Sequence, residues 1–390
     1  VFALGVASGD PLTDRVILWT RLVGDPTAVD GGGPSDDVEV AYDVATDETF
    51  DTLVASGIVT ATADRAHSVH VDVTKLEPGT SYAYRFRAGD QTSPTGRTRT
   101  VPGPDDAPES FRFVFASCQD YQWGQYAAWT HAAEEKDLDL VVFLGDYIYE
   151  TNLGDRSPDQ SGARVWANQA ALTLADYRQR YAQTKSDLRL QAAHHSAPWL
   201  TLFDDHEVSN NYAGDVGQAD GDQPRSRDRR LAAYQAWYEH TPIRIRPEPT
   251  SYDSLDIHRA IRWGRLATVF GIETRQHADP PACRPAVVDG TPSITLTDDG
   301  PSCDARLDES RTNLGEAQEA WLGEGLATSS TTWNVIANPV MMAGLNIGTA
   351  AEPKYTLDMW DGYPAARERL LARIVDSKVS NPVVVTGDWH

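Results

Sequence analysis

Five separate apolar runs of this chain each end in residue types that bind metal ions or phosphate. Such runs are typical of buried parallel strands, and in open α/β sheets ligands bind beyond the carboxyl ends of the strands. We therefore expect the five termini to converge on one site. The runs and their endings are Phe111–Ala116 with Ser117-Cys118-Gln119-Asp120, Leu138–Leu144 with Gly145-Asp146-Tyr147-Ile148-Tyr149-Glu150, Trp199–Phe203 with Asp204-Asp205-His206-Glu207 and Asn210-Asn211, Val335–Ala337 with Asn338, and Val383–Thr386 with Gly387-Asp388-Trp389-His390.

The length and charge of the chain bound the class of protein. At 390 residues, two or three domains are expected, and 41% hydrophobic residues allow a large core. No apolar stretch approaches the ~18 residues that span a bilayer, which predicts a soluble chain. A net charge of −23 argues against nucleic acid or an anionic membrane as a passive electrostatic partner. A phosphate substrate would then need cations focused locally, and the acidic surface itself fits either simple solvation or a Ca²⁺ binder.

Two of the three cysteines predict a disulfide. Cys283 and Cys303 lie in a segment rich in Pro, Gly and Asp, where a bridge would staple a long surface loop and would imply an oxidising compartment. The sequence pattern of the folded domain begins at Val1, without the charged and apolar regions of a signal peptide. We therefore expect a secreted protein whose export signal has been removed. The third cysteine, Cys118, has no predicted disulfide partner.

The chain divides into an all-β part and an α/β part. Residues 1–105 alternate apolar and polar residues at the spacing of a fibronectin- or immunoglobulin-like sandwich, and we assign this domain a packing or shielding role. Residues 110–390 alternate short apolar strands with helical patterns, which predicts an α/β domain, and specifically a layered α/β/β/α domain. The expected helices are 171–186, 227–240, 315–327 and 364–378.

The strand endings carry the ligand types of a multinuclear hydrolase. A single Gly-Asp pair is weak evidence for a metal site, because turns favour both residues. Here Gly-Asp-x-x-Tyr is combined with Asp-Asp-His-Glu and with Gly-Asp-x-His, which together offer carboxylate, amide and imidazole ligands. A carboxylate that bridges two cations could activate a hydroxide and hold phosphate oxygens, and Asp146 is the natural bridge.

The ordered set of motifs resembles the PhoD-like family of alkaline phosphatases and phosphodiesterases, over essentially the whole chain. The Gly-Asp-x-x-Tyr motif is also similar to that of purple acid phosphatases, in which the tyrosinate binds Fe³⁺. The motifs that carry the resemblance are Gly5–Pro11 with Val16–Arg21, Phe115–Cys118, Gly145–Tyr149, Asp176–Tyr181, Asp204–Val208 with Asn210-Asn211, Trp360–Pro364 and Thr386–His390.

The resemblance implies a mixed site with Fe³⁺ and Ca²⁺. Iron would be held by Cys118, Asp146, Tyr149 and His390, and calcium by Asp146, Asn211 and Asp388. The ligand chemistry agrees, since thiolate and tyrosinate suit a ferric ion while carboxylate and amide oxygens suit Ca²⁺. Spacing leaves Asn210 open as an alternative to Asn211. The alternatives without metal binding are a buried inert thiol for Cys118 and a core position for Tyr149.

Several further residues are candidates for contact with substrate. Asp205 and His206 are either ligands or groups that orient ligands, and we favour His206 as the acid near the leaving group. Asn338, Arg275 and Trp360 are candidate substrate-binding residues, with a structural role as the alternative for Asn338 and Trp360. Arg275 lies in Glu273-Thr274-Arg275-Gln276, where the family usually has Asp in place of Glu273.

The predicted function is that of a secreted, metal-dependent phosphoric ester hydrolase that acts through a metal-bound hydroxide. The first alternative is a phospholipase D that cleaves phospholipid diesters at the same site, with transient contact to a membrane surface; the chain has no His-x-Lys-x-x-x-x-Asp motif of the covalent-histidine enzymes. The second is a metal-stabilised secreted binding protein. Because His390 directly follows a predicted strand, we expect the catalytic domain to be incomplete at its C-terminus and a further segment of the same protein to cover the site.

Overall fold

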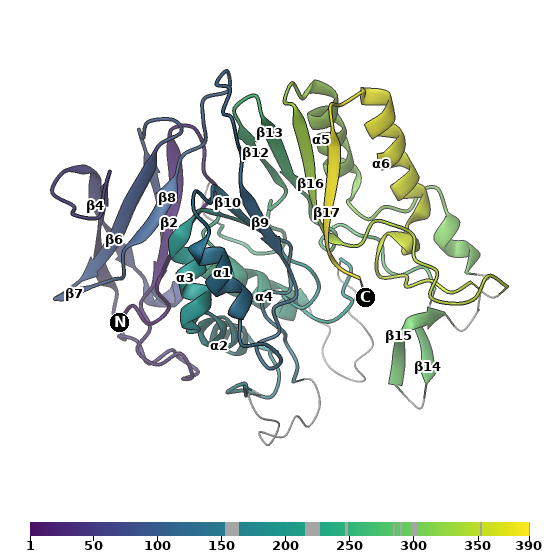
Figure 1. Cartoon of the computed structure of the whole chain (residues 1–390). Helices are drawn as coiled ribbons and strands as arrows, with labels where there is room; N and C mark the ends of the chain where they lie inside the picture. The colour runs from purple at the N-terminus through teal and green to yellow at the C-terminus, as the bar shows by residue number, and fades with distance from the viewer. Residues whose placement is uncertain are drawn as a thin grey trace.

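The computed structural model describes residues 1–152, 164–214, 227–245, 249–283, 285–288, 291–297, 303–351 and 353–389 (Figure 1). The strands are β1 Val6–Gly9, β2 Arg15–Arg21, β3 Val38–Ala45, β4 Leu53–Ala61, β5 Ser68–Thr74, β6 Ser81–Ala88, β7 Gln91–Thr92, β8 Gly96–Arg99, β9 Phe113–Ala116, β10 Leu140–Phe143, β11 Trp199–Thr201, β12 Arg259–Trp263, β13 Ala267–Gly271, β14 Pro285–Val288, β15 Thr291–Thr297, β16 Trp333–Val340 and β17 Pro382–Asp388. The helices are α1 Ala127–Glu134, α2 Leu174–Lys185, α3 Leu188–Ser196, α4 Arg227–His240, α5 Glu316–Thr328 and α6 Pro364–Ser377.

The first sheet has six strands in the order β5-β2-β1-β11-β10-β9. Strands β9, β10, β11 and β1 run parallel to one another, whereas β2 pairs antiparallel with both β1 and β5. The residues of β10 are buried on both faces: Val141 and Phe143 belong to one core cluster, and Leu140 and Val142 to another. This two-sided burial explains why the sequence of β10 is continuously apolar rather than alternating.

The second sheet has four strands in the order β12-β13-β16-β17, with β13, β16 and β17 parallel. One core cluster joins the two sheets, because it contains Leu140 and Leu200 of the first and Val269 and Val335 of the second. The carboxyl ends of β9, β10 and β11 and those of β16 and β17 can therefore meet at one edge.

Helices flank both sheets (Figure 1). Residues of α1 to α4 form a core cluster with β10 and β11, and residues of α5 and α6 form another with β13 and β16. Local signals fix the helix starts. Thr173 and Asp176 make a reciprocal capping box at α2, and Pro364 occupies the first turn of α6, where its missing N–H costs nothing.

The N-terminal region is a β-sandwich, as predicted, but one of its two sheets is shared. The order β4-β3-β6-β7, with β8 beside β6, forms the outer sheet. Its core side chains, such as Val40 and Phe86, pack against Val16 and Val71 of β2 and β5, which belong to the six-stranded sheet. The proposed division between residues 105 and 110 stays a prediction, since the sheet runs across it.

The predicted disulfide between Cys283 and Cys303 is present, with Cα atoms 6.2 Å apart. The segment between these cysteines differs from the expected long loop, because it contains the hairpin of β14 and β15. In the sequence, Asp289-Gly290 separates the two apolar runs, and this dipeptide is a strong hairpin signal. Among the described residues, every helix is too short or too polar to cross a bilayer.

A buried lysine lies where the N-terminal strands meet the helices. The Nζ of Lys185, at the end of α2, lies 4.6 Å from the ring centre of Trp19 on β2 and 4.9 Å from that of Tyr147. Its Nζ is 3.3 Å from Nε2 of His194 on α3. Within the described residues no carboxylate forms an ion pair with it, and burial lowers its pKa to about 7.

We predict that Lys185 makes the protein more stable as the pH rises from about 7 to about 10.5. In this window the unfolded chain binds the proton that the folded chain has lost, so the free energy of unfolding increases by up to about 1.4 kcal/mol per pH unit. Urea unfolding at pH 7.5 and 9.5 should show that the difference between wild type and Lys185→Met grows with pH. The exposed control Lys136→Met should show no such growth. An equal difference for Lys185→Met at both pH values would contradict the prediction.

Candidate metal centre

The site begins where β10 ends, at Gly145 and Asp146. Gly145 has φ +119°, and a Cβ atom there would lie 2.4 Å from the backbone nitrogen of Asp204. Only glycine allows the chain after β10 to pass so close to the chain after β11. Gly387 acts similarly in β17, since a Cβ atom there would lie 2.4 Å from the carbonyl oxygen of Pro339 and 3.0 Å from Cβ of Ser117. Gly145 thus lets the chains after β10 and β11 approach closely, and Gly387 does the same for β17, β16 and the chain after β9.

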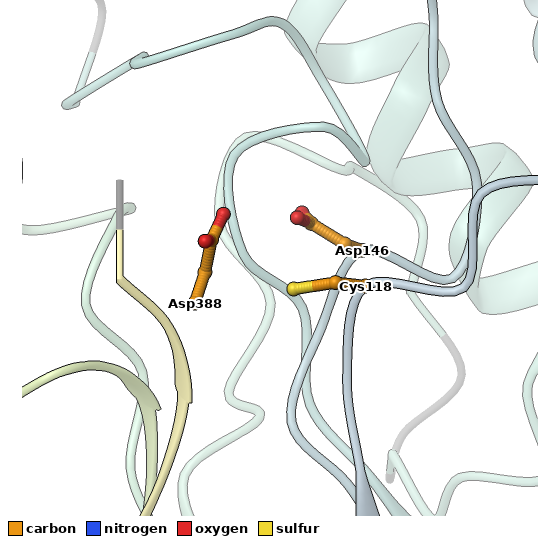
Figure 2. A group of neighbouring side chains, drawn as sticks. All are labelled: Cys118, Asp146 and Asp388. Atoms are coloured by element: carbon orange, nitrogen blue, oxygen red, sulfur yellow. The ribbon is translucent and has the colours of Figure 1, made fainter. Parts of the chain in front are cut away.

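Five of the predicted site residues offer ligand atoms to common space. The possible ligand atoms of Cys118, Asp146 and Asp388 all lie within 4.8 Å of one another. Figure 2 shows these three side chains turned toward the same space, with Asp388 coming from β17. The same limit holds for Asp146, Asp205 and His206, and for Asp146, Asp204, Asp205 and Asp388. Asp146 belongs to all three groups, which is the position expected of a bridging carboxylate.

Three of the predicted ligand residues share an uncommon backbone conformation. Cys118, Asp146 and Asn211 have φ of 56°, 59° and 55°, in the left-handed region that non-glycine residues rarely adopt. Each costs on the order of 1–3 kcal/mol and persists only when the surroundings impose it. Backbone hydrogen bonds from Cys118 N to Gly145 O (3.1 Å) and from Gln119 N to Asp146 O (3.1 Å) join the first two of these turns.

The remaining predicted ligands lie as follows. Tyr149 donates from its hydroxyl to Oδ2 of Asp146 at 3.3 Å. The backbone N–H of Asn211 donates to Oδ2 of Asp205 at 2.6 Å, and that of Asn210 donates to Glu150. His390 lies outside the described residues, so its role as an iron ligand stays a prediction.

The carboxylates at the ends of β10 and β11 are buried, and burial changes their pKa values. Burial raises the pKa of Asp146 well above its ordinary value, and the negative charges of Asp205, Asp204 and Glu207 add to this. Burial and the nearby Asp146 carboxylate likewise raise the pKa of the Cys118 thiol and of the Tyr149 hydroxyl. A cation in the common space would reverse each of these effects and favour thiolate and tyrosinate. The donor set therefore fits a metal ion.

His206 is affected in the opposite direction. Burial alone would lower its pKa, but the carboxylates of Asp205, Glu150 and Asp146 outweigh it and raise the pKa well above the ordinary value. Its Nδ1 lies 2.7 Å from Oε2 of Glu150, and its ring lies 4.2 Å, centre to centre, from that of Tyr149.

Glu207 ties the ends of β10 and β11 together. Its carboxylate accepts the backbone N–H groups of Asp146 (3.0 Å), Asp204 (2.9 Å) and Tyr147 (2.6 Å). Burial raises its pKa to about 7, against the opposing effect of these hydrogen bonds. The motif Asp204-Asp205-His206-Glu207 contains this residue, but the sequence alone gave no indication of its role.

Arg275 follows β13 and is a buried cross-link between carboxylates. Its Nε lies 2.5 Å from Oδ1 of Asp204, its Nη1 lies 2.7 Å from Oδ2 of Asp358, and its Nη2 lies 3.9 Å from Oδ1 of Asp205. The side chain is 3% exposed. Contact of Arg275 with substrate stays a prediction, but the contacts named here already give it a structural task.

Asn338 and Trp360 are both fully buried and contact each other. Trp360 donates from Nε1 to Oδ1 of Asn338 at 3.4 Å. Asn338 pairs with Thr386 in the register of β16 and β17, two residues before Asp388. Their role in substrate binding stays a prediction.

Sequence reasoning missed three residues of this centre: Asp204 as a possible ligand, Glu150 as the partner of His206, and Asp358 as the partner of Arg275. The first two directly follow predicted strands or their motifs, so position alone could have indicated them. Asp358 lies in an irregular segment and gave no signal.

Comparison with known proteins identifies the family to which the chain is similar. The PhoD-like phosphatase family matches residues 113–390, and the N-terminal domain of PhoD-like phosphatases matches residues 1–102. Alkaline phosphatase D of Bacillus subtilis (strain 168) is 44% identical over 392 residues, covering 100% of this chain and 64% of the relative. The chain thus spans less than two thirds of that curated relative. A solved structure of PhoD is 42% identical with a TM-score of 0.89, covering 99% of this chain and 71% of that one.

We predict that Arg275→Met lowers the free energy of unfolding by about 3–5 kcal/mol, because it leaves buried carboxylates without their cation. Urea unfolding of the purified protein measures this. The matched control is Arg97→Met, which removes an ion pair to Glu48 whose side chains are 70% and 54% exposed, and it should cost no more than about 1 kcal/mol. Equal losses in the two variants would contradict the prediction.

Proposed function

Since this chain belongs to the PhoD-like phosphatase family, we propose that it is part of a secreted, metal-dependent phosphoric ester hydrolase. The observation that carries the proposal is that Cys118, Asp146, Asp205, His206 and Asp388 offer ligand atoms in overlapping groups that all contain Asp146. A merely structural metal site would not need a shared carboxylate. The predicted domains, 1–105 and 110–390, and the α/β/β/α order of the second are part of this proposal, and the core clusters between sheets and helices support them.

The proposed ligands separate by chemistry. Cys118 and Tyr149 would hold Fe³⁺ together with Asp146 and His390, since thiolate and phenolate oxygen suit a ferric ion. Asp146, Asn211 and Asp388 would hold Ca²⁺, which prefers oxygen ligands, and Asp204 is a further carboxylate within reach of this group. When bound, the cations supply Lewis acidity to phosphate oxygens and lower the pKa of water toward neutrality.

The protein's own residues then hold and move the proton of the leaving group. His206 is the proposed acid: as the bond between phosphorus and the leaving oxygen breaks, the bonding pair stays on that oxygen and His206 gives it a proton. Asp205 accepts the backbone N–H groups of His206 (3.0 Å) and Asn211 (2.6 Å). It thereby fixes the loop that carries both the proposed acid and a proposed ligand.

The charge of the chain indicates how an anionic substrate would be attracted. The chain carries a net charge of −23, so an anionic phosphate ester would be attracted by the bound cations rather than by the surface at large. The disulfide between Cys283 and Cys303 supports an oxidising, extracytoplasmic location. Phosphomonoesters and phosphodiesters are the proposed substrates, and phospholipid diesters are the alternative that the assay separates.

We predict that Asp146→Asn lowers kcat/KM by at least about 100-fold, because it weakens the carboxylate shared by all three groups of ligand atoms. Hydrolysis of p-nitrophenyl phosphate, bis-p-nitrophenyl phosphate and phosphatidylcholine at fixed Ca²⁺ measures this and ranks the substrate classes. The exposed control Asp137→Asn, with a side chain 90% exposed, should match wild type. A wild-type protein with bound metal that cleaves none of the three would refute the proposed function.

We also predict a visible charge-transfer band from tyrosinate and thiolate on Fe³⁺. Tyr149→Phe should remove the tyrosinate contribution, and Cys118→Ser the thiolate contribution, whereas Tyr42→Phe in β3 should leave the spectrum unchanged. Absorption spectra recorded together with elemental analysis test this. An iron-loaded protein whose band is the same in wild type and Tyr149→Phe would exclude Tyr149 as a ligand.

A further inference from the structure

Glu150 uses both of its carboxylate oxygens on the loop that follows β11. It comes directly after Tyr149 and is 0% exposed. Its Oε2 lies 2.7 Å from Nδ1 of His206, and its Oε1 accepts the backbone N–H of Asn210 at 2.7 Å. One buried carboxylate therefore contacts the proposed acid and the residue beside the proposed calcium ligand Asn211.

The contact with Glu150 determines which nitrogen of His206 remains available. With a carboxylate oxygen 2.7 Å away, Nδ1 is the ring nitrogen placed to donate to Glu150, and Nε2 is the second ring nitrogen. Among the described residues Nε2 has no hydrogen-bond partner, and the His206 side chain is 11% exposed. The ring is further restrained by Tyr149, whose ring centre lies 4.2 Å away.

Burying a carboxylate costs free energy unless hydrogen bonds or charges from its partners compensate for the lost hydration. A structural need to satisfy the N–H of Asn210 would be met by a neutral oxygen. The carboxylate of Glu207 accepts three backbone N–H groups, whereas one oxygen of Glu150 contacts an imidazole nitrogen. A carboxylate in that position holds a histidine in one orientation and tautomer, as in active-site pairs of histidine with a carboxylate.

We propose that Glu150 is the positioning residue that holds His206 with Nε2 directed at the oxygen of the leaving group. This inference rests on the proposed function. In the step concerned, the bond between phosphorus and the leaving oxygen breaks and its electron pair stays on oxygen. The proton of Nε2 transfers to that oxygen, His206 becomes neutral, and water restores the proton.

The test uses Glu150→Gln and a series of phosphodiesters whose leaving groups range from p-nitrophenolate to simple alkoxides. Gln retains an oxygen for Asn210 but loses the charge that orients His206. Because p-nitrophenolate leaves without a proton, its release should fall less than about 3-fold, whereas alkoxide release should fall at least about 100-fold. His206→Gln should show the same dependence on leaving group, and the double variant should lose little more than either single variant.

Three comparisons make the outcome decisive. Glu150→Asp retains the charge, so it should recover more alkoxide release than Glu150→Gln, and it serves if the latter does not fold. Glu48→Gln, on an exposed side chain, should match wild type. A wild-type protein inactive on the whole series would refute the proposed function itself. An active wild type with equal loss on all leaving groups in Glu150→Gln, or with loss of bound metal in that variant, would overturn the role of Glu150.

Discussion

The mutual repulsion of buried carboxylates is the constraint on which the rest of this structure depends. Asp146, Asp204, Asp205 and Glu207 are each at most 1% exposed and lie at the ends of β10 and β11. Uncompensated charges in such a place would protonate or force the chain apart. The fold compensates with the guanidinium of Arg275, which is held by the second sheet, and with backbone N–H groups directed at Glu207 and Asp205. Bound cations are the remaining compensation that we propose.

This compensation explains why the two sheets must meet. The carboxylates come mainly from the first sheet, whereas Arg275 follows β13 and Asp388 ends β17, both in the second. The apolar cluster between the sheets fixes their relative position through residues such as Leu202 and Ala337. The charged centre therefore depends on the apolar core. The core fixes the distance between the two sheets, and that distance brings Arg275 within reach of the carboxylates.

Much of this arrangement was predictable from the sequence. The apolar run before Asp146 and the Gly-Asp pair identified β10 and its site, and 3.6-residue spacing located α4 at the residues that the structure shows. Helices α1 and α3 were missed, because Ala127–Glu134 and Leu188–Ser196 are short and their apolar spacing is weak. The pairing of β1 with β11 could not be predicted, since Gly9 and Trp199 are far apart in sequence and nothing local encodes their register. The contacts of Arg275 were hidden for the same reason, because Asp204 and Asp358 reach it from distant segments.

The shared six-stranded sheet has a consequence for the independence of the N-terminal region. Because β1 hydrogen-bonds to β11, the backbone that leads into Asp204 and Asp205 has a neighbour on each side only while residues 6–9 are in place. Without these residues, β11 would become an exposed edge strand that could pair with other chains. The N-terminal β-region is thus better regarded as a permanent flank of the six-stranded sheet than as a detachable module, and exchanging it between relatives would have to preserve the register of β1 with β11.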